Sequence, residues 1–351
     1  MATLSPPSPS HATPSSTTDA PSPAHIALWT SRIALGILTL GGIALAALGI
    51  SLSLTVQMIG YLIGMVALNL PHGGYEHFDN LRNRRVSFSL RYIVMYLAFL
   101  AGFVSLFVVA PVIALGLAFA TAIIKGGQGG LKVMDALCGT DHLITQWQRL
   151  LAVFVRGGAI MLVPLLTWPE LYISFSTYML HMFDMQATLP FISHLPETQA
   201  AIGTVYGLAL LTHLGMGWWT GGATAAWRID AAETLLLVAF FLAVPMVLAV
   251  GLYFPLWYSL RQTARTTEVS QAEPAPDRLS LPLTWAAMVL GALVTFGLMA
   301  VFYAFVPHPL GGASLLPGAV AFYTIFVCIL ALPHIVVGDW LDQARGIWYV
   351  P

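Results

Sequence analysis

The sequence predicts an all-α fold, a polytopic bundle of about 8–10 transmembrane helices. Of the 351 residues, 58% are hydrophobic and only 8% are charged, and long apolar stretches recur along most of the chain. A soluble domain carries roughly 25% charged residues, so a water-soluble fold is excluded. The net charge is −1 and the 14 Lys and Arg residues are scattered. No basic surface is therefore expected, which argues against nucleic acid as a partner.

The N-terminal residues 1–24 differ in composition from the rest of the chain. They are rich in Pro, Ser and Thr and contain no Lys or Arg. They therefore lack both core-forming residues and the basic start of a signal peptide, and we expect a disordered tail. Residues 25–351 are predicted to form a single transmembrane domain.

The predicted membrane crossings follow the apolar stretches in chain order. Residues 26–70 are too long for one crossing and predict two helices that turn near residues 49–53. Further crossings are predicted at residues 92–108, 111–124, 150–168, 200–219, 234–257, 283–306 and 318–337. Residues 171–185 are apolar but short, so their length alone does not assign them.

Basic residues near the crossings predict the orientation, because short cytoplasmic loops collect Lys and Arg. They follow the second and fourth crossings, the crossing that ends at residue 257, and the last crossing. All of these helix ends lie on the cytoplasmic side only if residues 171–185 dip through or into the membrane as an extra segment. The count is then roughly nine full helices plus one partial helix, or ten. We expect a multi-pass protein of the cell membrane with a cytoplasmic amino terminus.

Ionisable side chains in this apolar background are the candidate functional residues, because such groups usually face a bundle interior or a cavity. His72 and Glu76 are spaced i, i+4, which places both on one face of a helix and suits a metal ligand with a carboxylate partner. A polar helix end at the interface is the competing interpretation. His334 lies inside an apolar run and needs a partner there, so it fits a structural role as well as a ligand role.

Other polar features carry weaker signals. His213 lies near a predicted helix end, where a satisfied interface residue is more typical than a ligand. Lys125 precedes the glycine-rich residues 126–130, but that stretch lacks the GKS or GKT ending of a phosphate-binding loop. Cys138 and Cys328 show no CxxC spacing, so neither a disulfide framework nor a zinc site is indicated.

Several segments, taken in order, resemble the Brp/Blh family of integral-membrane β-carotene 15,15′-dioxygenases. PHGGYEH at residues 71–77 resembles the family motif PHGxxDH, with Glu76 in place of Asp, and residues 332–342 resemble its terminal LPHxxVVxWMD signature. Between them, residues 156–170 resemble its RGG…PLL…PE stretch, and residues 233–254 resemble the helix before its second metal motif. The likeness covers essentially the whole chain after the tail.

The resemblance implies an Fe(II) centre held by four histidines beside a hydrophobic channel, where O₂ cleaves the central double bond of β-carotene into two molecules of retinal. His72 aligns with one iron ligand. Glu76 would orient that ligand, and His334 would serve a structural role near the site. The implied partners are a carotenoid or retinoid substrate, the lipid bilayer and a retinal-binding rhodopsin.

The other ligand positions depart from the family pattern. Lys125 stands at a ligand histidine of the family's HWGxGD-like motif, while Tyr258 and Gln262 stand at both histidines of its WHSxRH motif. A Lys ammonium has no lone pair, and Gln is a weak iron ligand compared with imidazole. Tyr258 is a poor substitute in a ferrous site.

Two functional interpretations remain open at this point. The first is an active iron dioxygenase, in which His72 is an iron ligand that Glu76 orients, or in which a substitute set of two histidines and one carboxylate is drawn from His72, Glu76, His77 and His334. The second is a catalytically inactive membrane protein that binds a carotenoid or retinal. An unrelated transporter would need paired midplane charges and internal repeats, and the sequence shows neither.

Overall fold

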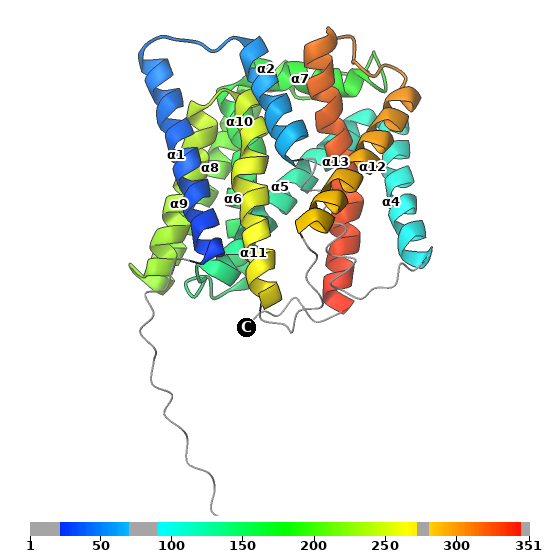
Figure 1. Ribbon diagram of the computed structural model, residues 1–351. Helices are drawn as coiled ribbons and strands as arrows, with labels where there is room; N and C mark the ends of the chain where they lie inside the picture. The colour runs from blue at the N-terminus through cyan, green and yellow to red at the C-terminus, as the bar shows by residue number, and fades with distance from the viewer. Residues whose placement is uncertain (1–21, 70–89, 272–280, 345–351) are drawn as a thin grey trace, which may run out of the picture.

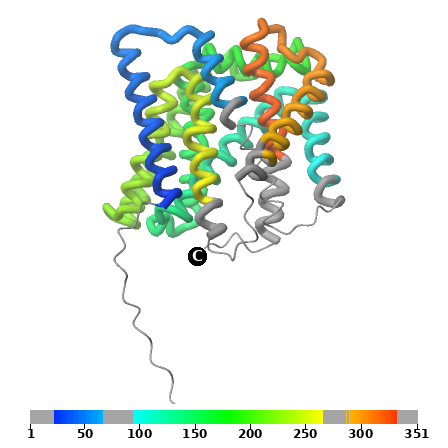
Figure 2. Tube along the Cα trace, in the orientation of Figure 1, coloured from blue at the N-terminus to red at the C-terminus, as the bar shows by residue number. Residues whose placement is uncertain are grey.

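A computed structural model describes residues 22–69, 90–271 and 281–344, most of which Figure 2 traces in colour. Over these residues the chain is an all-α bundle, which confirms the predicted fold class. In Figure 1, α1, α8 and α9 form one side of the bundle and α4, α12 and α13 form the other. Most of the predicted tail, residues 1–21, lies outside the described residues.

The helix boundaries follow, in chain order. The helices are α1 (Pro23–Ala47), α2 (Leu54–Leu62), the π-helical η1 (Ile63–Asn69), α4 (Leu90–Val109), α5 (Pro111–Leu137), α6 (Gln146–Thr167), α7 (Pro169–His181), the short η2 (Ile192–His194), α8 (Leu195–Gly221), α9 (Ala225–Ala243), α10 (Met246–Tyr253), the π-helical η3 (Phe254–Ser259), α11 (Leu260–Gln271), α12 (Leu281–Phe305) and α13 (Leu315–Ala344).

Local sequence explains where several helices begin. The side chains of Ser22, Ser53 and Thr224 each accept a hydrogen bond from a backbone N–H in the first turn that follows. Thr145 forms a reciprocal pair with Gln148 at the start of α6. Such caps satisfy donors that a helix start leaves unpaired. α1 begins at Pro23, two residues before the predicted start of the transmembrane domain.

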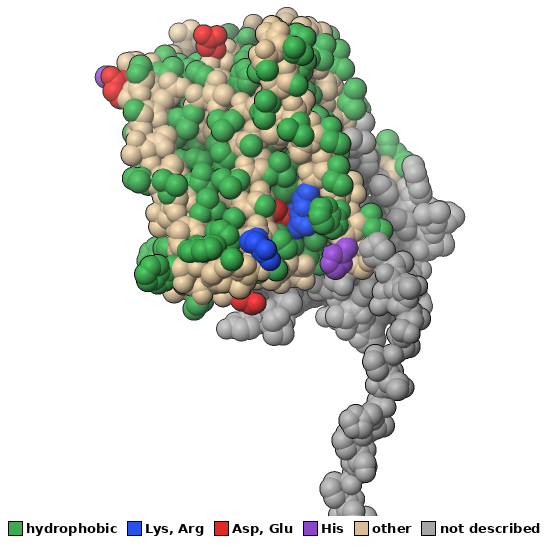
Figure 3. Space-filling model, turned by 90° about the vertical axis from the view of Figure 1, so that its left-hand side faces the viewer, with side chains coloured by type: hydrophobic (Ala, Val, Ile, Leu, Met, Phe, Trp, Pro, Cys, Tyr) green, Lys and Arg blue, Asp and Glu red, His purple; other side chains and the backbone are tan. Residues whose placement is uncertain are grey.

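Five helical stretches among the described residues are long and apolar enough to cross a bilayer. They are Pro23–Ala47, Pro111–Leu137, Gln146–Thr167, Ile192–Gly221 and Leu315–Leu332. Figure 3 shows the face that lies on the left in Figure 1, where hydrophobic side chains dominate and charged ones are few. Long apolar helices with apolar outer faces suggest a membrane protein.

α5 extends well past the predicted crossing at residues 111–124, which was too short. The helix continues through Lys125 and its glycines to Leu137. These glycines let α5 approach α6 closely, because a Cβ at Gly127 would collide with the carbonyl oxygen of Val153, and one at Gly157 with that of Ile123. Glycine costs helix propensity, but here it is required by helix packing.

The predicted single crossing at residues 234–257 is wrong, because the chain breaks there into two runs. Val244 leaves the helix in an extended conformation, and Pro245 caps the start of α10. Proline has no N–H for the preceding turn and its ring clashes with it. α9 and the run α10–η3–α11 consequently fold back on each other, as the pairing of Glu233 in α9 with Arg261 in α11 requires.

The break gives two helical runs where one crossing was predicted, and the charge distribution predicted one crossing more than the long apolar stretches. The segment at residues 171–185 was expected to supply it, but α7 has only 13 residues. At 1.5 Å per residue, such a helix is too short to span the hydrocarbon core. Figure 1 shows α7 lying across the end of the bundle opposite the start of α1.

A first prediction concerns the α5–α6 contact. Gly127→Ala should lower the free energy of unfolding by about 1–3 kcal/mol, because the added methyl group forces the two helices apart. The measurement is thermal unfolding in detergent, followed by circular dichroism. Gly116→Ala on the same helix is the matched control, since a Cβ there meets nothing within 4 Å. Equal losses in the two variants would contradict the close approach.

Candidate functional site

Some of the sequence-predicted site residues cannot be placed. His72, Glu76 and His77 lie outside the described residues. His334 falls within α13, but its side chain is also outside the described part of the structure. Their roles as ligand, orienting carboxylate and supporting histidine therefore stay predictions.

Lys125, Tyr258 and Gln262 meet at one contact between α5 and the η3–α11 run. The ammonium nitrogen of Lys125 lies 6.0 Å from the centroid of the Tyr258 ring, within the range of a cation–π interaction. One turn further along α5, a Cβ added at Gly129 would lie 2.7 Å from both the Gln262 amide nitrogen and a carbon of the Tyr258 ring. The three positions that the resemblance assigns to iron ligands are therefore neighbours.

Glycine and a widened helical turn create this contact. Gly129 has no side chain, so the Tyr258 ring and the Gln262 amide can lie against the α5 backbone. On the other side, Tyr258 belongs to the π-helical η3, which contains Pro255. Proline cannot donate to the preceding turn, and π-helical turns often occur at functional sites.

The side chains at this contact do not fit a ferrous centre. The positive charge of Lys125 would repel a cation, and Gln262 and Tyr258 offer an amide and a phenol where imidazoles are expected. Within the described residues, no group of three or more His, Cys, Asp or Glu is arranged to hold a metal ion. We therefore derive no iron chemistry from this part of the chain.

A buried ion network lies directly behind the contact, and its centre is Glu233 on α9. Arg32 of α1 donates to Oε1 of Glu233 at 2.9 and 2.7 Å, and Arg156 of α6 donates to Oε2 at 2.6 Å. Arg261 of α11 donates to both carboxylate oxygens, at 2.8 and 2.7 Å. Arg156, Glu233 and Arg261 are at most 2% exposed. One carboxylate thus joins four helices.

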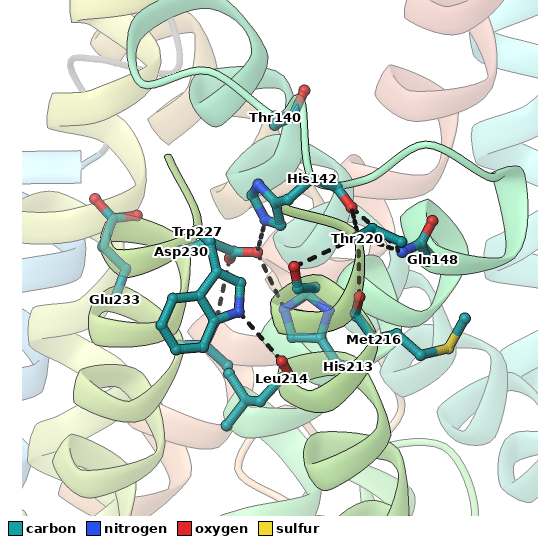
Figure 4. A network of polar contacts seen from close by, with 12 residues as sticks. Thr140, His142, Gln148, His213, Leu214, Met216, Thr220, Trp227, Asp230 and Glu233 are labelled. Carbon is teal, nitrogen blue, oxygen red and sulfur yellow. Dashed lines mark hydrogen bonds and ion pairs between the residues drawn. The ribbon is translucent and has the colours of Figure 1, made fainter. Parts of the chain in front are cut away.

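Asp230, one turn earlier on α9, extends the network. Its Oδ1 accepts a hydrogen bond from Arg156 at 2.6 Å, and its Oδ2 lies 2.9 Å from Nε2 of His142 and 3.2 Å from Nε2 of His213. Figure 4 shows both imidazoles pointing at this carboxylate from the α5–α6 loop and from α8. His213 is therefore buried and within ion-pair distance of Asp230, but neither of its ring nitrogens makes a hydrogen bond within the described residues, so it is not the satisfied interface residue that the sequence predicted.

The network is also linked to the thiol of Cys138, at the end of α5. Nη2 of Arg32 lies 3.5 Å from this sulfur. Burial raises the pKa of the Cys138 thiol and the Glu233 carboxylate raises it further, while the nearby arginines partly offset both effects. The thiol is therefore protonated and weakly nucleophilic at neutral pH.

The network holds the candidate site in place through Arg261. This residue lies between Tyr258 and Gln262 in the sequence, and its guanidinium stacks 4.1 Å from the centroid of the Trp257 ring. Because Glu233 binds Arg261 through both oxygens, the backbone that carries Tyr258 and Gln262 has little freedom to rotate.

Sequence reasoning missed this network. From the sequence, Arg156 and Glu233 were named only as parts of segments that resemble the family, and Asp230 was not named. A usable signal was present, since charges of both signs lie within or beside apolar stretches and each needs a partner there. The pairing of these charges depends on the chain break at Pro245, which was not predicted from the sequence.

An apolar cavity lies between α2, α5, α6, α7, α10 and α13. Its volume is about 510 Å³, counted out to its open side, and its walls include Phe119, Ile160 and Tyr172. Polar groups on its wall are few. The hydroxyl of Tyr61 lies 2.7 Å from that of Thr324, so these two groups satisfy each other.

A second prediction tests the network. Glu233→Gln should lower the free energy of unfolding by about 3–5 kcal/mol, because two buried guanidiniums and that of the partly buried Arg32 then surround a neutral amide. Thermal unfolding in detergent measures the loss. Asp135→Asn is the control, since Asp135 pairs with the partly exposed Arg149 and such pairs contribute about 1 kcal/mol or less. An equally large loss in the control would refute a special role for Glu233.

The chain is similar to known proteins over most of its length. A family model described as beta-carotene 15,15′-dioxygenase matches residues 63–342. The protein named probable beta-carotene 15,15′-dioxygenase Brp from Halobacterium salinarum strains R1 and NRC-1 is 51% identical over 318 residues, which cover 86% of this chain and 88% of the relative. Probable beta-carotene 15,15′-dioxygenase Blh of strain NRC-1 is 32% identical over 339 residues, covering 90% and 93%. No solved structure matches the chain. The predicted resemblance is thereby confirmed, and the chain belongs to the Brp/Blh family of β-carotene 15,15′-dioxygenases.

Proposed function

We propose that this protein binds a carotenoid or a retinoid inside the membrane and does so without the four-histidine iron site of its family. The observation that carries the proposal is the contact of Lys125 with Tyr258, beside Gln262. Their proximity supports the alignment that places them at ligand positions. Their chemistry is that of a cation, a phenol and an amide, none of which replaces imidazole as a ligand for Fe(II).

The apolar cavity is the binding site in this proposal. A polyene offers only carbon and hydrogen over most of its length, so it suits walls built from residues such as Phe119, Ile160 and Met179. The hydroxyls of Tyr61 and Thr324 pair with each other, and the described wall residues carry no charged side chain that would favour a charged ligand.

A second function, oxidative cleavage of β-carotene to retinal, is favoured by one observation. The Brp protein of Halobacterium salinarum, 51% identical to this chain, is named a probable β-carotene dioxygenase. In that case Fe(II) would be held by residues outside the described part, with His72 as ligand, Glu76 as its orienting carboxylate and His334 nearby. Retinal made there would be available to a retinal-binding rhodopsin.

We also propose that residues 25–351 act as one unit in the cell membrane, with the amino terminus cytoplasmic. The α5–α6 and α8–α9 connections and the end of α11 lie at the same end of the bundle as the start of α1 (Figure 1). Basic residues fall in or near these places, among them Lys132, Arg149 and Arg228. An excess of Lys and Arg is typical of the cytoplasmic side.

The third prediction follows from this function. When the chain is expressed in cells that make β-carotene, unbleached pigment should co-purify with it, and retinal should not exceed the level in cells with an empty vector. Chromatography of the extracted pigments measures both. Ser176→Leu should lower the bound pigment several-fold, because Ser176 is buried and lines the cavity.

Ser174→Leu is the matched control, since Ser174 lies on the same helix but not on the cavity wall. Thermal unfolding of both variants verifies that they fold. Retinal in place of bound carotene would establish the dioxygenase instead. If the purified chain carried no pigment and the cells held no retinal, binding and cleavage would both be contradicted.

A further inference from the structure

Lysine is rare in this chain. Only two of the 14 basic residues are lysines, Lys125 and Lys132, and both lie on α5. The other basic residues are arginines, whose guanidinium group stays protonated in proteins. A lysine amine can lose its proton and then act as a nucleophile toward carbonyl carbon, which an arginine cannot do. Lys125 therefore offers an amine that can act as a nucleophile in the bundle, which the arginines of the ion network cannot.

Lys125 lies next to a residue that packs against the cavity wall. The neighbouring residue Gly126 packs against Ile160, whose side chain forms part of the cavity wall. A ligand that fills the cavity and extends past Ile160 would approach the turn of α5 that carries Lys125.

The family name identifies the functional group that such a ligand would carry. A dioxygenase that splits a carbon–carbon double bond places one oxygen atom on each carbon, so cleavage of a carotenoid leaves aldehydes. Resting on the proposed function of the cavity, we propose that Lys125 binds the aldehyde end of an apolar carotenoid cleavage product, such as retinal, as an imine.

The step balances without a further reagent. The neutral amine of Lys125 attacks the aldehyde carbon and forms a C–N bond, and proton transfer gives a carbinolamine. Loss of the aldehyde oxygen as water then leaves a C=N bond, with no change in oxidation state. Once protonated, the imine nitrogen carries a positive charge, which the face of the Tyr258 ring, 6.0 Å from Nζ, stabilises.

The fourth prediction tests this bond directly. The full-length chain in lipid nanodiscs is incubated with all-trans-retinal and treated with sodium borohydride, which converts an imine into a stable secondary amine. Peptide mapping by mass spectrometry should find the retinyl group on Lys125. Lys125→Arg should lose at least nine-tenths of the label, whereas Lys132→Arg, a matched change two turns along the same helix, should keep it.

The outcomes separate this inference from the function on which it rests. Label on Lys132 or on the N-terminal amine in place of Lys125, or equal labelling of Lys125→Arg, overturns the imine. Co-purified β-carotene in the same variants reports on the cavity alone. If Lys125→Arg retains carotene and the unaltered chain forms no Lys125 adduct, the imine is wrong and the binding function stands. If the adduct forms but no carotene is retained, the imine stands and the carotenoid site is wrong.

Discussion

The bundle depends on one buried carboxylate. Glu233 accepts hydrogen bonds from arginines of α1, α6 and α11, while it belongs to α9 itself. None of these charges is stable alone in an apolar interior, so each helix is held at the level where the others meet it. Two carboxylates, Asp230 and Glu233, face three arginines, which leaves one formal positive charge in excess (3 − 2 = 1) when the histidines are neutral.

The Glu233 network is connected to the contact of Lys125 with Tyr258 and Gln262 through α11 and the turn before it. Arg261 is bound at both guanidinium nitrogens by Glu233, and Tyr258 and Gln262 lie on the same turns of chain. Their side chains consequently face α5, where glycine opens the backbone to them. The network thus supports the contact to which the family resemblance assigns iron ligands, and this chain places an amine, a phenol and an amide there.

The sequence was sufficient for the fold class and the family. Composition and the repeated apolar stretches predicted an all-α bundle, and most helices begin near their expected residues. The break at Pro245 was not predicted, because residues 234–257 are uniformly apolar and one proline is tolerated in membrane helices. The extension of α5 was missed for a similar reason. Glycines in a sequence usually indicate the end of a helix, and their role in helix packing becomes clear only when the partner helix is known.

The candidate site was predictable in part. Motif comparison located Lys125, Tyr258 and Gln262, and the structure brings these three together. The ion network was not found, because Arg156, Asp230 and Arg261 are far apart in sequence and their pairing is a property of the folded bundle. His72, Glu76 and His334 stay predictions from motif alone.

The central claim is that an amine, a phenol and an amide occupy the place of iron-binding imidazoles. Iron content after anaerobic loading with Fe(II) and removal of loosely bound metal tests it most directly, in the unaltered chain and in a triple variant with Lys125→His, Tyr258→His and Gln262→His. The account predicts far less than one iron per unaltered chain and at least about tenfold more in the variant, since even changes around metal ligands alter affinity by 10–100-fold. One tightly held iron per unaltered chain, with no gain in the variant, would contradict it.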